Sequence, residues 1–232
     1  MLRDLQTLRS VVIPVNEIYA SIQGEAKWTG TPTWFIRTQG CPVGCPWCDT
    51  KYTWEADPEK QKPILQVLTK KASDATWNVI NADAILGVLA TKPDVRHVVI
   101  TGGEPCLHEY LGPLTRILVE AKYTVQIETS GTFPIDVDPA TWVTCSPKIG
   151  MPGGRTIIAE SIARANEVKY PVGRERDIKR LLQEVLPLVN PDALVWLQPI
   201  SQNKKATALC VEAAMKHGFR VSAQVHKFLD LP

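Results

Sequence analysis

Short apolar runs that alternate with longer helical patterns set the strongest limit on the folds open to this chain of 232 residues. The runs at 97–100 and 194–197 place apolar residues at successive positions, which is typical of parallel strands covered on both faces. Strand, helix and strand in repetition indicate a parallel sheet with crossover helices. The sequence therefore predicts an α/β fold with an interior sheet.

The pattern assigns the elements as follows. Strands are predicted at 33–39, 97–101, 124–129, 142–146, 167–170, 194–198 and 220–225. Helices are predicted at about 82–91, 110–121, 157–163, 174–189 and 204–217. Asn203 and Gly218 flank the last of these helices and are predicted to cap its two ends.

Chain length decides between the possible parallel-sheet architectures. A closed eight-stranded barrel typically needs about 250 residues, and only six or seven strands are predicted here. We therefore expect an incomplete (β/α) barrel of about six parallel strands, with an open doubly wound sheet as the alternative. Residues 1–232 are expected to form a single domain with an insertion at about 52–81, where Lys, Asp, Pro and Glu crowd between 55 and 63.

Charge and hydropathy exclude several classes of partner. A formal net charge of +2, from 26 Lys plus Arg against 24 Asp plus Glu, is too small to indicate binding to nucleic acid. The apolar stretch 11–13 ends at Pro14, and it is too short for a signal peptide or a membrane span. We expect a cytoplasmic protein with no nucleic-acid or membrane partner, whose thiols stay reduced.

Small and polar residues follow the predicted strands. They occupy the segments 40–48, 102–105, 130–131, 147–148 and 199–201. Because the carboxyl ends of parallel strands meet at one edge of a sheet, these segments are predicted to surround one shared mouth.

Three of the six cysteines are closely spaced. Cys41, Cys45 and Cys48 lie within eight residues, so a tight loop can turn their sulfurs toward one centre. The other three lie in or beside predicted elements and are interpreted as buried packing thiols. They are Cys106, Cys145 and Cys210.

The spacing of the three cysteines leaves three interpretations open. A structural zinc site would need a fourth ligand, such as Cys106 or His108. A purely hydrophobic role is disfavoured by the two prolines and the glycine between the cysteines, which indicate a loop. An iron–sulfur cluster with only three thiolates would keep one iron open to an exogenous ligand.

Two motifs resemble the radical S-adenosylmethionine (SAM) superfamily. The loop Cys41-x3-Cys45-x-Trp47-Cys48, with an aromatic residue before its last cysteine, is similar to the cluster-binding loop of that superfamily. Thr101-Gly102-Gly103-Glu104-Pro105 resembles its GGE motif, which holds the methionine amino group. The resemblance implies a partial (β/α) barrel that holds a 4Fe-4S cluster and SAM.

A narrower resemblance, to the family of 7-carboxy-7-deazaguanine synthases, covers most of the chain after the first ten residues. It rests on Asn16-Glu17-Ile18, Ser21-Ile22-Gln23-Gly24-Glu25, Phe35-Ile36-Arg37, Cys48-Asp49-Thr50, Glu128-Thr129-Ser130-Gly131, Ser146-Pro147-Lys148, Gln198-Pro199-Ile200-Ser201 and His226-Lys227. Ala26 stands where glycine is frequent in the family, which would tighten the turn after Glu25.

This family implies an activity and its partners. The implied reaction is radical-mediated ring contraction of 6-carboxy-5,6,7,8-tetrahydropterin to 7-carboxy-7-deazaguanine with loss of ammonia, in queuosine and other 7-deazapurine synthesis. A homodimer and a flavodoxin-type reductant are implied as well. Two further hypotheses stay open: a glycyl-radical activase, which acts on a protein, and a zinc or electron-transfer module without catalysis.

The family resemblance also implies roles for individual residues. Cys41, Cys45 and Cys48 would bind the cluster, and Thr50 would bind Mg²⁺. The SAM site would be formed by Trp47, Gly103, Ser146, Pro147, Lys148, Gln198, Pro199, Ile200 and Ser201. The substrate site would be formed by Ile22, Gln23, Gly24, Arg37 and Thr101.

Some of these roles are supported by the chemistry of the side chain, and others compete with a purely structural interpretation. The Arg37 guanidinium can bind a carboxylate through two parallel hydrogen bonds. Gly103 has no Cβ and would let its backbone approach the cofactor, whereas Lys148 alone would suit a solvated loop. Glu25 and Glu128 are candidates for contacts to the substrate ring or for structural carboxylates. His226 would reach the site only if the last seven residues fold back over the mouth.

Overall fold

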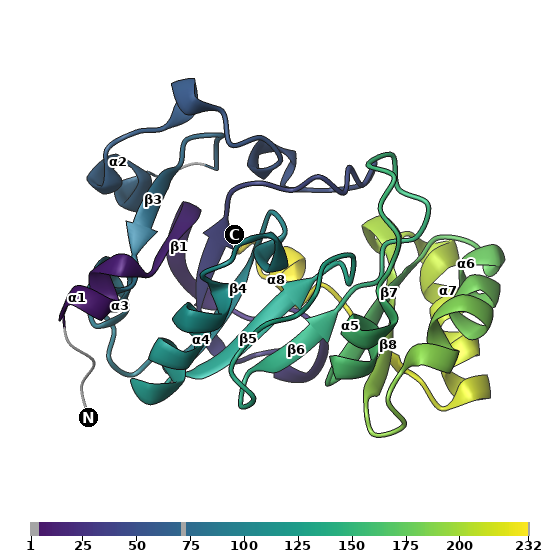
Figure 1. The fold of residues 1–232 in the computed structure, drawn as a ribbon. Helices are drawn as coiled ribbons and strands as arrows, with labels where there is room; N and C mark the ends of the chain where they lie inside the picture. Colours follow the sequence, from purple (N-terminus) through teal and green to yellow (C-terminus); the bar gives the residue numbers. More distant parts are fainter. Residues whose placement is uncertain (1–4, 71–72, 232) are drawn as a thin grey trace.

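The computed structural model describes residues 5–70 and 73–231 (Figure 1). Its strands are β1 (Val12–Ile22), β2 (Pro32–Thr38), β3 (Asn78–Asn81), β4 (His97–Gly102), β5 (Thr124–Thr129), β6 (Trp142–Cys145), β7 (Glu167–Val172), β8 (Leu194–Pro199) and β9 (Arg220–Val221). Its α-helices are α1 (Leu5–Ser10), α2 (Ile64–Thr69), α3 (Ala82–Leu89), α4 (Leu111–Glu120), α5 (Ala159–Arg164), α6 (Glu175–Arg180), α7 (Lys204–His217) and α8 (Val225–Phe228). None of the helices in these described ranges is long and apolar enough to cross a membrane.

The described strands form one nine-stranded sheet in the order β3-β1-β2-β4-β5-β6-β7-β8-β9. From β2 to β9 each strand pairs in parallel with the next one. A doubly wound sheet would reverse its order at a switch point, whereas these parallel strands follow one another in sequence order. The fold is an incomplete (β/α) barrel, as predicted, with six longer parallel strands and the two-residue β9.

The register sorts side chains into rows across the sheet. Ile36, Ile100, Ile127 and Val143 are neighbours on β2, β4, β5 and β6, and all four are fully buried in the core shared with the helices. Burial of each such side chain stabilises the fold by about 2 kcal/mol. Successive side chains of a strand point to opposite faces, so the next row points into the barrel. That row consists of Arg37, Thr101, Glu128 and Thr144.

Helix α7 shows why some elements follow directly from sequence. It spans the predicted range, and the Asn203 side chain accepts hydrogen bonds from the backbone N–H groups of Lys205 and Ala206, at 2.9 and 3.2 Å. Gly218 ends it in the left-handed conformation, with φ of 72°, which glycine adopts without steric cost.

Strand β1 was not predicted. It pairs antiparallel with both β2 and β3, although Pro14 and Asn16 lie inside it and argue against a central strand. The register slips between Val15 and Glu17, and the buried Asn16 amide donates to the Gln39 side chain and to the Asp74 carbonyl, each at 2.8 Å. The bulge therefore accommodates Asn16, whereas Pro14 lies beyond the register with β2, which begins at Val15.

The segment 52–81, predicted as an insertion, follows β2 and leads to β4. It contains α2 and, at its end, the edge strand β3, whose partner is β1. Residues 71–72 of this segment, like 1–4 at the N-terminus, lie outside the described residues. The segment thus lies on the connection from β2 to β4 and is tied to the sheet through β3.

Two predicted elements are wrong in part. The helix predicted at 174–189 is α6 followed by a π turn (Leu181–Val185) and a 3-10 turn (Leu186–Leu188), because Pro187 has no N–H to continue an α-helix. The strand predicted at 220–225 ends at Val221, and the chain then forms α8. In Figure 1, α8 lies behind β4 and β5, on the opposite side of the sheet from α4.

Gly102 at the end of β4 has φ of +106°, and a Cβ there would overlap the Arg37 side chain and lie 2.6 Å from the Thr38 nitrogen. We predict that Gly102→Ala lowers the free energy of unfolding by about 3 kcal/mol, from backbone strain and overpacking together. The control is Gly87→Ala in α3, where a Cβ meets nothing within 4 Å. That change should raise the free energy of unfolding by about 0.5–1 kcal/mol. Urea unfolding measures both, and equal stability of Gly102→Ala and wild type would contradict the prediction.

Candidate active site

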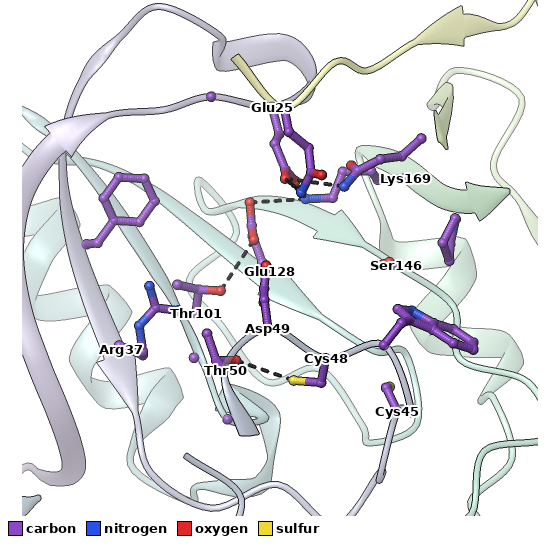
Figure 2. Close-up of a pocket in the computed structure, with 18 of the residues that line it drawn as sticks. Glu25, Arg37, Cys45, Cys48, Asp49, Thr50, Thr101, Glu128, Ser146 and Lys169 are labelled. Carbon is purple, nitrogen blue, oxygen red and sulfur yellow. Dashed lines mark hydrogen bonds and ion pairs between the residues drawn. The ribbon is translucent and has the colours of Figure 1, made fainter. Parts of the chain in front are cut away.

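One cavity of about 640 Å³ opens at the carboxyl ends of the parallel strands (Figure 2). This is within the range of pockets that enclose small molecules. Almost every residue singled out from sequence lines it: Ile22, Gln23, Gly24, Arg37, Cys41, Cys45, Trp47, Cys48, Thr50, Thr101, Gly103, Ser146, Lys148, Gln198, Pro199, Ile200 and Ser201. Pro147 is buried between Ser146 and Lys148 and is not among the described residues that line the cavity.

The cysteine loop is held at its base by backbone hydrogen bonds. The Gly40 N–H donates to the Thr53 carbonyl at 2.7 Å, and the Cys41 N–H donates to the Trp54 carbonyl at 2.9 Å. Farther along, the Cys48 N–H donates to the Cys45 carbonyl at 3.0 Å. The beginning of the segment 52–81 therefore supports the loop that carries the three thiols.

Two glycines allow other loops to pack against the cysteine loop. A Cβ on Gly103 would overlap the Gly40 carbonyl, and a Cβ on Gly153 would overlap the Pro42 carbonyl. Gly153 also donates its N–H to the Val43 carbonyl at 3.1 Å. Gly103 is thus required by contact between two protein loops, a reason that its sequence interpretation as a cofactor contact did not include.

The donor set at this loop suits an iron–sulfur cluster. Cys41, Cys45 and Cys48 are free thiols that line the same cavity. Among the residues the structure describes, no three His, Cys, Asp or Glu side chains are grouped to hold a single metal ion. In a cluster each thiolate binds its own iron, so the three cysteines fit a 4Fe-4S group without such close grouping.

Arg37 has partners within the protein. Its Nε donates to Glu17 Oε1 at 2.6 Å, and its Nη2 donates to the Tyr19 hydroxyl at 2.7 Å. Tyr52 and Ser73, from the segment 52–81, also donate to the Glu17 carboxylate. Burial raises the pKa of Tyr19 to about 12, although Arg37 opposes the shift. The guanidinium is therefore fixed by β1, and sequence reasoning did not identify Glu17 as its partner.

Lys169 on β7 lies at the centre of an ionic cluster that was not predicted. Its ammonium group forms ion pairs with Glu25 and, at 3.5 Å, with Glu128. Although burial alone would lower the pKa of Lys169, the two carboxylates raise it. Burial likewise opposes ionisation of Glu25, but Lys169 lowers the pKa of Glu25 to about 2. The sequence did contain a signal for this cluster, a lysine between Val168 and Tyr170 in a predicted strand. Successive side chains of a strand point to opposite faces, so Lys169 points into the barrel when its apolar neighbours face the core.

The C-terminal segment folds back over the cavity. The Val225 N–H donates to the Gly24 carbonyl at 2.9 Å, and a Cβ on Gly24 would overlap the His226 ring. The fold-back that His226 needed to reach the site is therefore present, and His226 lines the cavity. Ala26 adopts φ of +56°, so it keeps a left-handed turn at a cost of about 1–2 kcal/mol rather than tightening it.

Lys148 belongs to the cavity rather than to a solvated loop. It is half-buried, and its ammonium group donates to the Ser146 carbonyl and hydroxyl at 2.8 and 2.5 Å. Burial lowers its pKa, an effect that the nearby Cys45 opposes. Away from the loop, Cys145 and Cys210 are buried as predicted, whereas Cys106 is only half-buried.

Comparison with known proteins agrees with this geometry. The family model of the radical SAM superfamily matches residues 35–138. The 7-carboxy-7-deazaguanine synthase of Escherichia coli K12 is 45% identical over 221 residues, which cover 94% of this chain and 98% of that protein. The synthase of Aquifex aeolicus is 33% identical, with full coverage of both chains.

A solved structure shows the same similarity. The crystal structure of QueE from Escherichia coli matches with a TM-score of 0.91 and 43% identity, over 96% of this chain and 98% of that one. The chain belongs to the family of 7-carboxy-7-deazaguanine synthases, within the radical SAM superfamily.

Proposed function

We propose that this protein converts 6-carboxy-5,6,7,8-tetrahydropterin into 7-carboxy-7-deazaguanine by radical-mediated ring contraction with loss of ammonia. The observation that carries the proposal is that the three-cysteine loop and the Arg37 guanidinium open into the same cavity. A cluster-bound cofactor and a small carboxylate substrate can therefore be held side by side. The product would serve queuosine and other 7-deazapurine synthesis.

Three cysteines and several neighbours would hold the cofactors. Cys41, Cys45 and Cys48 would bind the 4Fe-4S cluster, which with bound SAM supplies a radical that abstracts hydrogen. The SAM site would be lined by Trp47, Gly103, Ser146, Lys148 and Gln198–Ser201. Pro147, although outside the cavity lining, would fix the backbone between Ser146 and Lys148.

The substrate carboxylate would lie at the Arg37 end of the cavity. Glu17 and Tyr19 use the Nε and Nη2 groups of Arg37, and its Nη1 group would donate to the substrate. The ring would meet the backbone of Ile22, Gln23 and Gly24 and the side chain of Thr101. Thr50 would bind Mg²⁺ near the cluster, since its hydroxyl lies 3.5 Å from the Cys48 sulfur and magnesium needs few protein ligands.

Other parts of the proposal concern the setting of the enzyme. We place it in the cytoplasm, where the six free cysteines stay reduced, and we expect a flavodoxin-type protein as its reductant. We further propose that the chain is one domain, since the segment 52–81 shares the sheet through β3, and that it forms a homodimer.

Turnover by anaerobically reconstituted protein tests the function. With reductant, SAM and Mg²⁺, mass spectrometry should detect 7-carboxy-7-deazaguanine formed from the carboxypterin. Cys45→Ala should lose the visible absorption of the cluster and the product together, because one cluster ligand is missing. The control Cys210→Ala removes a buried thiol in α7 and should keep the colour. Wild-type protein that cleaves SAM without forming the deazapurine would refute the substrate assignment.

Removal of the Arg37 guanidinium separates a small carboxylate substrate from a protein substrate. Arg37→Ala should lower kcat/KM for the pterin by about 100-fold or more, because a charge-assisted carboxylate contact is lost. Cluster content and reductive cleavage of SAM should persist. Arg176→Ala, at a side chain that is 77% exposed, is the control and should match wild type. Full pterin turnover by Arg37→Ala would favour an activase acting on a protein.

A further inference from the structure

Lys169 places a full positive charge inside the barrel, where the proposed roles make no use of it. Its side chain is only 8% exposed. It is two residues beyond Glu167, which pairs with Thr144. Its side chain therefore points into the barrel, as those of Thr144 and Arg37 do. Figure 2 shows it extended toward Glu25 and Glu128, which come from different parts of the chain. A buried cation in this position is costly unless its partners fix it.

Glu25 is the more deeply buried of the two partners and has the shorter contacts. Its carboxylate accepts from Lys169, from the Gln198 amide at 3.2 Å and from the Gln224 amide at 2.9 Å. Its side chain is 11% exposed. Glu25 therefore joins β7, β8 and the C-terminal segment, and it has the contacts of a structural carboxylate.

Glu128 is the partner that retains capacity for a ligand. Its contacts are long: Gln23 and Thr101 donate at 3.3 Å, and Lys169 lies at 3.5 Å. Its side chain is 22% exposed, twice as much as that of Glu25, and it lines the cavity. A carboxylate has about four acceptor sites, so Glu128 can accept further hydrogen bonds from a molecule in the cavity.

The ring of the proposed substrate has a matching group. Its guanine-like edge presents a ring N–H and an amino group side by side, and one carboxylate can accept from both. Thr101 donates to Glu128 and is the β4 neighbour of Arg37. A ligand with a carboxylate at Arg37 and an N–H edge at Glu128 would therefore span this row of the barrel.

We propose that Lys169 is a positioning residue that fixes the Glu128 carboxylate as the hydrogen-bond acceptor for the N–H edge of the substrate ring. This inference rests on the proposed function. Glu25 and Glu128 share one ammonium group, and without it two buried carboxylates would face each other. One of them would then take up a proton, and a protonated carboxyl donates where the ring edge also donates.

Anaerobic equilibrium dialysis of the carboxypterin against cluster-loaded protein with SAM, but without reductant, tests this role independently of turnover. Lys169→Met should weaken binding at least tenfold. With reductant, KM should rise by a similar factor while kcat stays within about threefold of wild type. Lys216→Met, at an exposed lysine near the end of α7, is the matched control and should bind as wild type does.

A double-mutant cycle decides whether Lys169 acts through Glu128. Glu128→Gln alone should also weaken binding, and the double variant Lys169→Met/Glu128→Gln should bind no more weakly than the weaker single variant. Multiplied defects, or unchanged binding in a folded Lys169→Met protein, would overturn the proposal. Lys169→Arg keeps the cation and should recover most of the affinity lost in Lys169→Met.

Folding and function are checked in the same series. Thermal unfolding identifies a variant that does not fold, and Lys169→Gln then replaces Lys169→Met in the cycle. If neither neutral variant folds, Lys169→Arg decides, because a folded arginine variant with tenfold weaker binding contradicts the role of the cation. If wild-type protein neither binds nor converts the pterin, the proposed function has failed. If wild type converts it while the cycle is additive, only the role of Lys169 has failed.

Discussion

Burial of one row of aliphatic side chains between the sheet and its helices determines where the chemistry of this protein lies. Ile36, Ile100, Ile127 and Val143 are fully buried neighbours on four strands. A one-residue slip would turn this row into the barrel and would move Arg37 and Glu128 into the core, where their charges would be unpaired. The apolar register therefore orients the cavity before any polar contact forms.

Charges that point into the barrel are stable only in pairs or clusters, since an isolated buried ion is far costlier than a hydrogen-bonded one. Glu17 compensates Arg37 at one end of the cavity, and Glu25 with Glu128 compensates Lys169 at the other. Each compensating group is fixed by further donors from other elements. The protein thus keeps several full charges beside a small cavity without leaving either of these two cations unpaired.

Local signals explain which elements the sequence predicts well. Strand β5 and helix α7 match their predicted ranges, since period and caps are encoded within each segment. Strand β1 contains Pro14 and depends on a bulge whose Asn16 side chain reaches residues near 74, so no local pattern reveals it. The cysteine loop and the GGE motif were predicted because each is contiguous in sequence.

The ionic cluster around Lys169 could not be predicted in the same way. Its members come from the turn after β1, from β5, β7 and β8 and from the segment before α8, and only the closed register brings them together. Gln224 reaches Glu25 because β9 ends after two residues and the chain leaves the sheet there. Ala26 keeps its left-handed turn, and its N–H donates to the Ser222 hydroxyl at 3.0 Å. Glu25 in turn contacts Lys169. The shape of the cavity beside Lys169 therefore depends on how the last residues pack against the turn at Gly24.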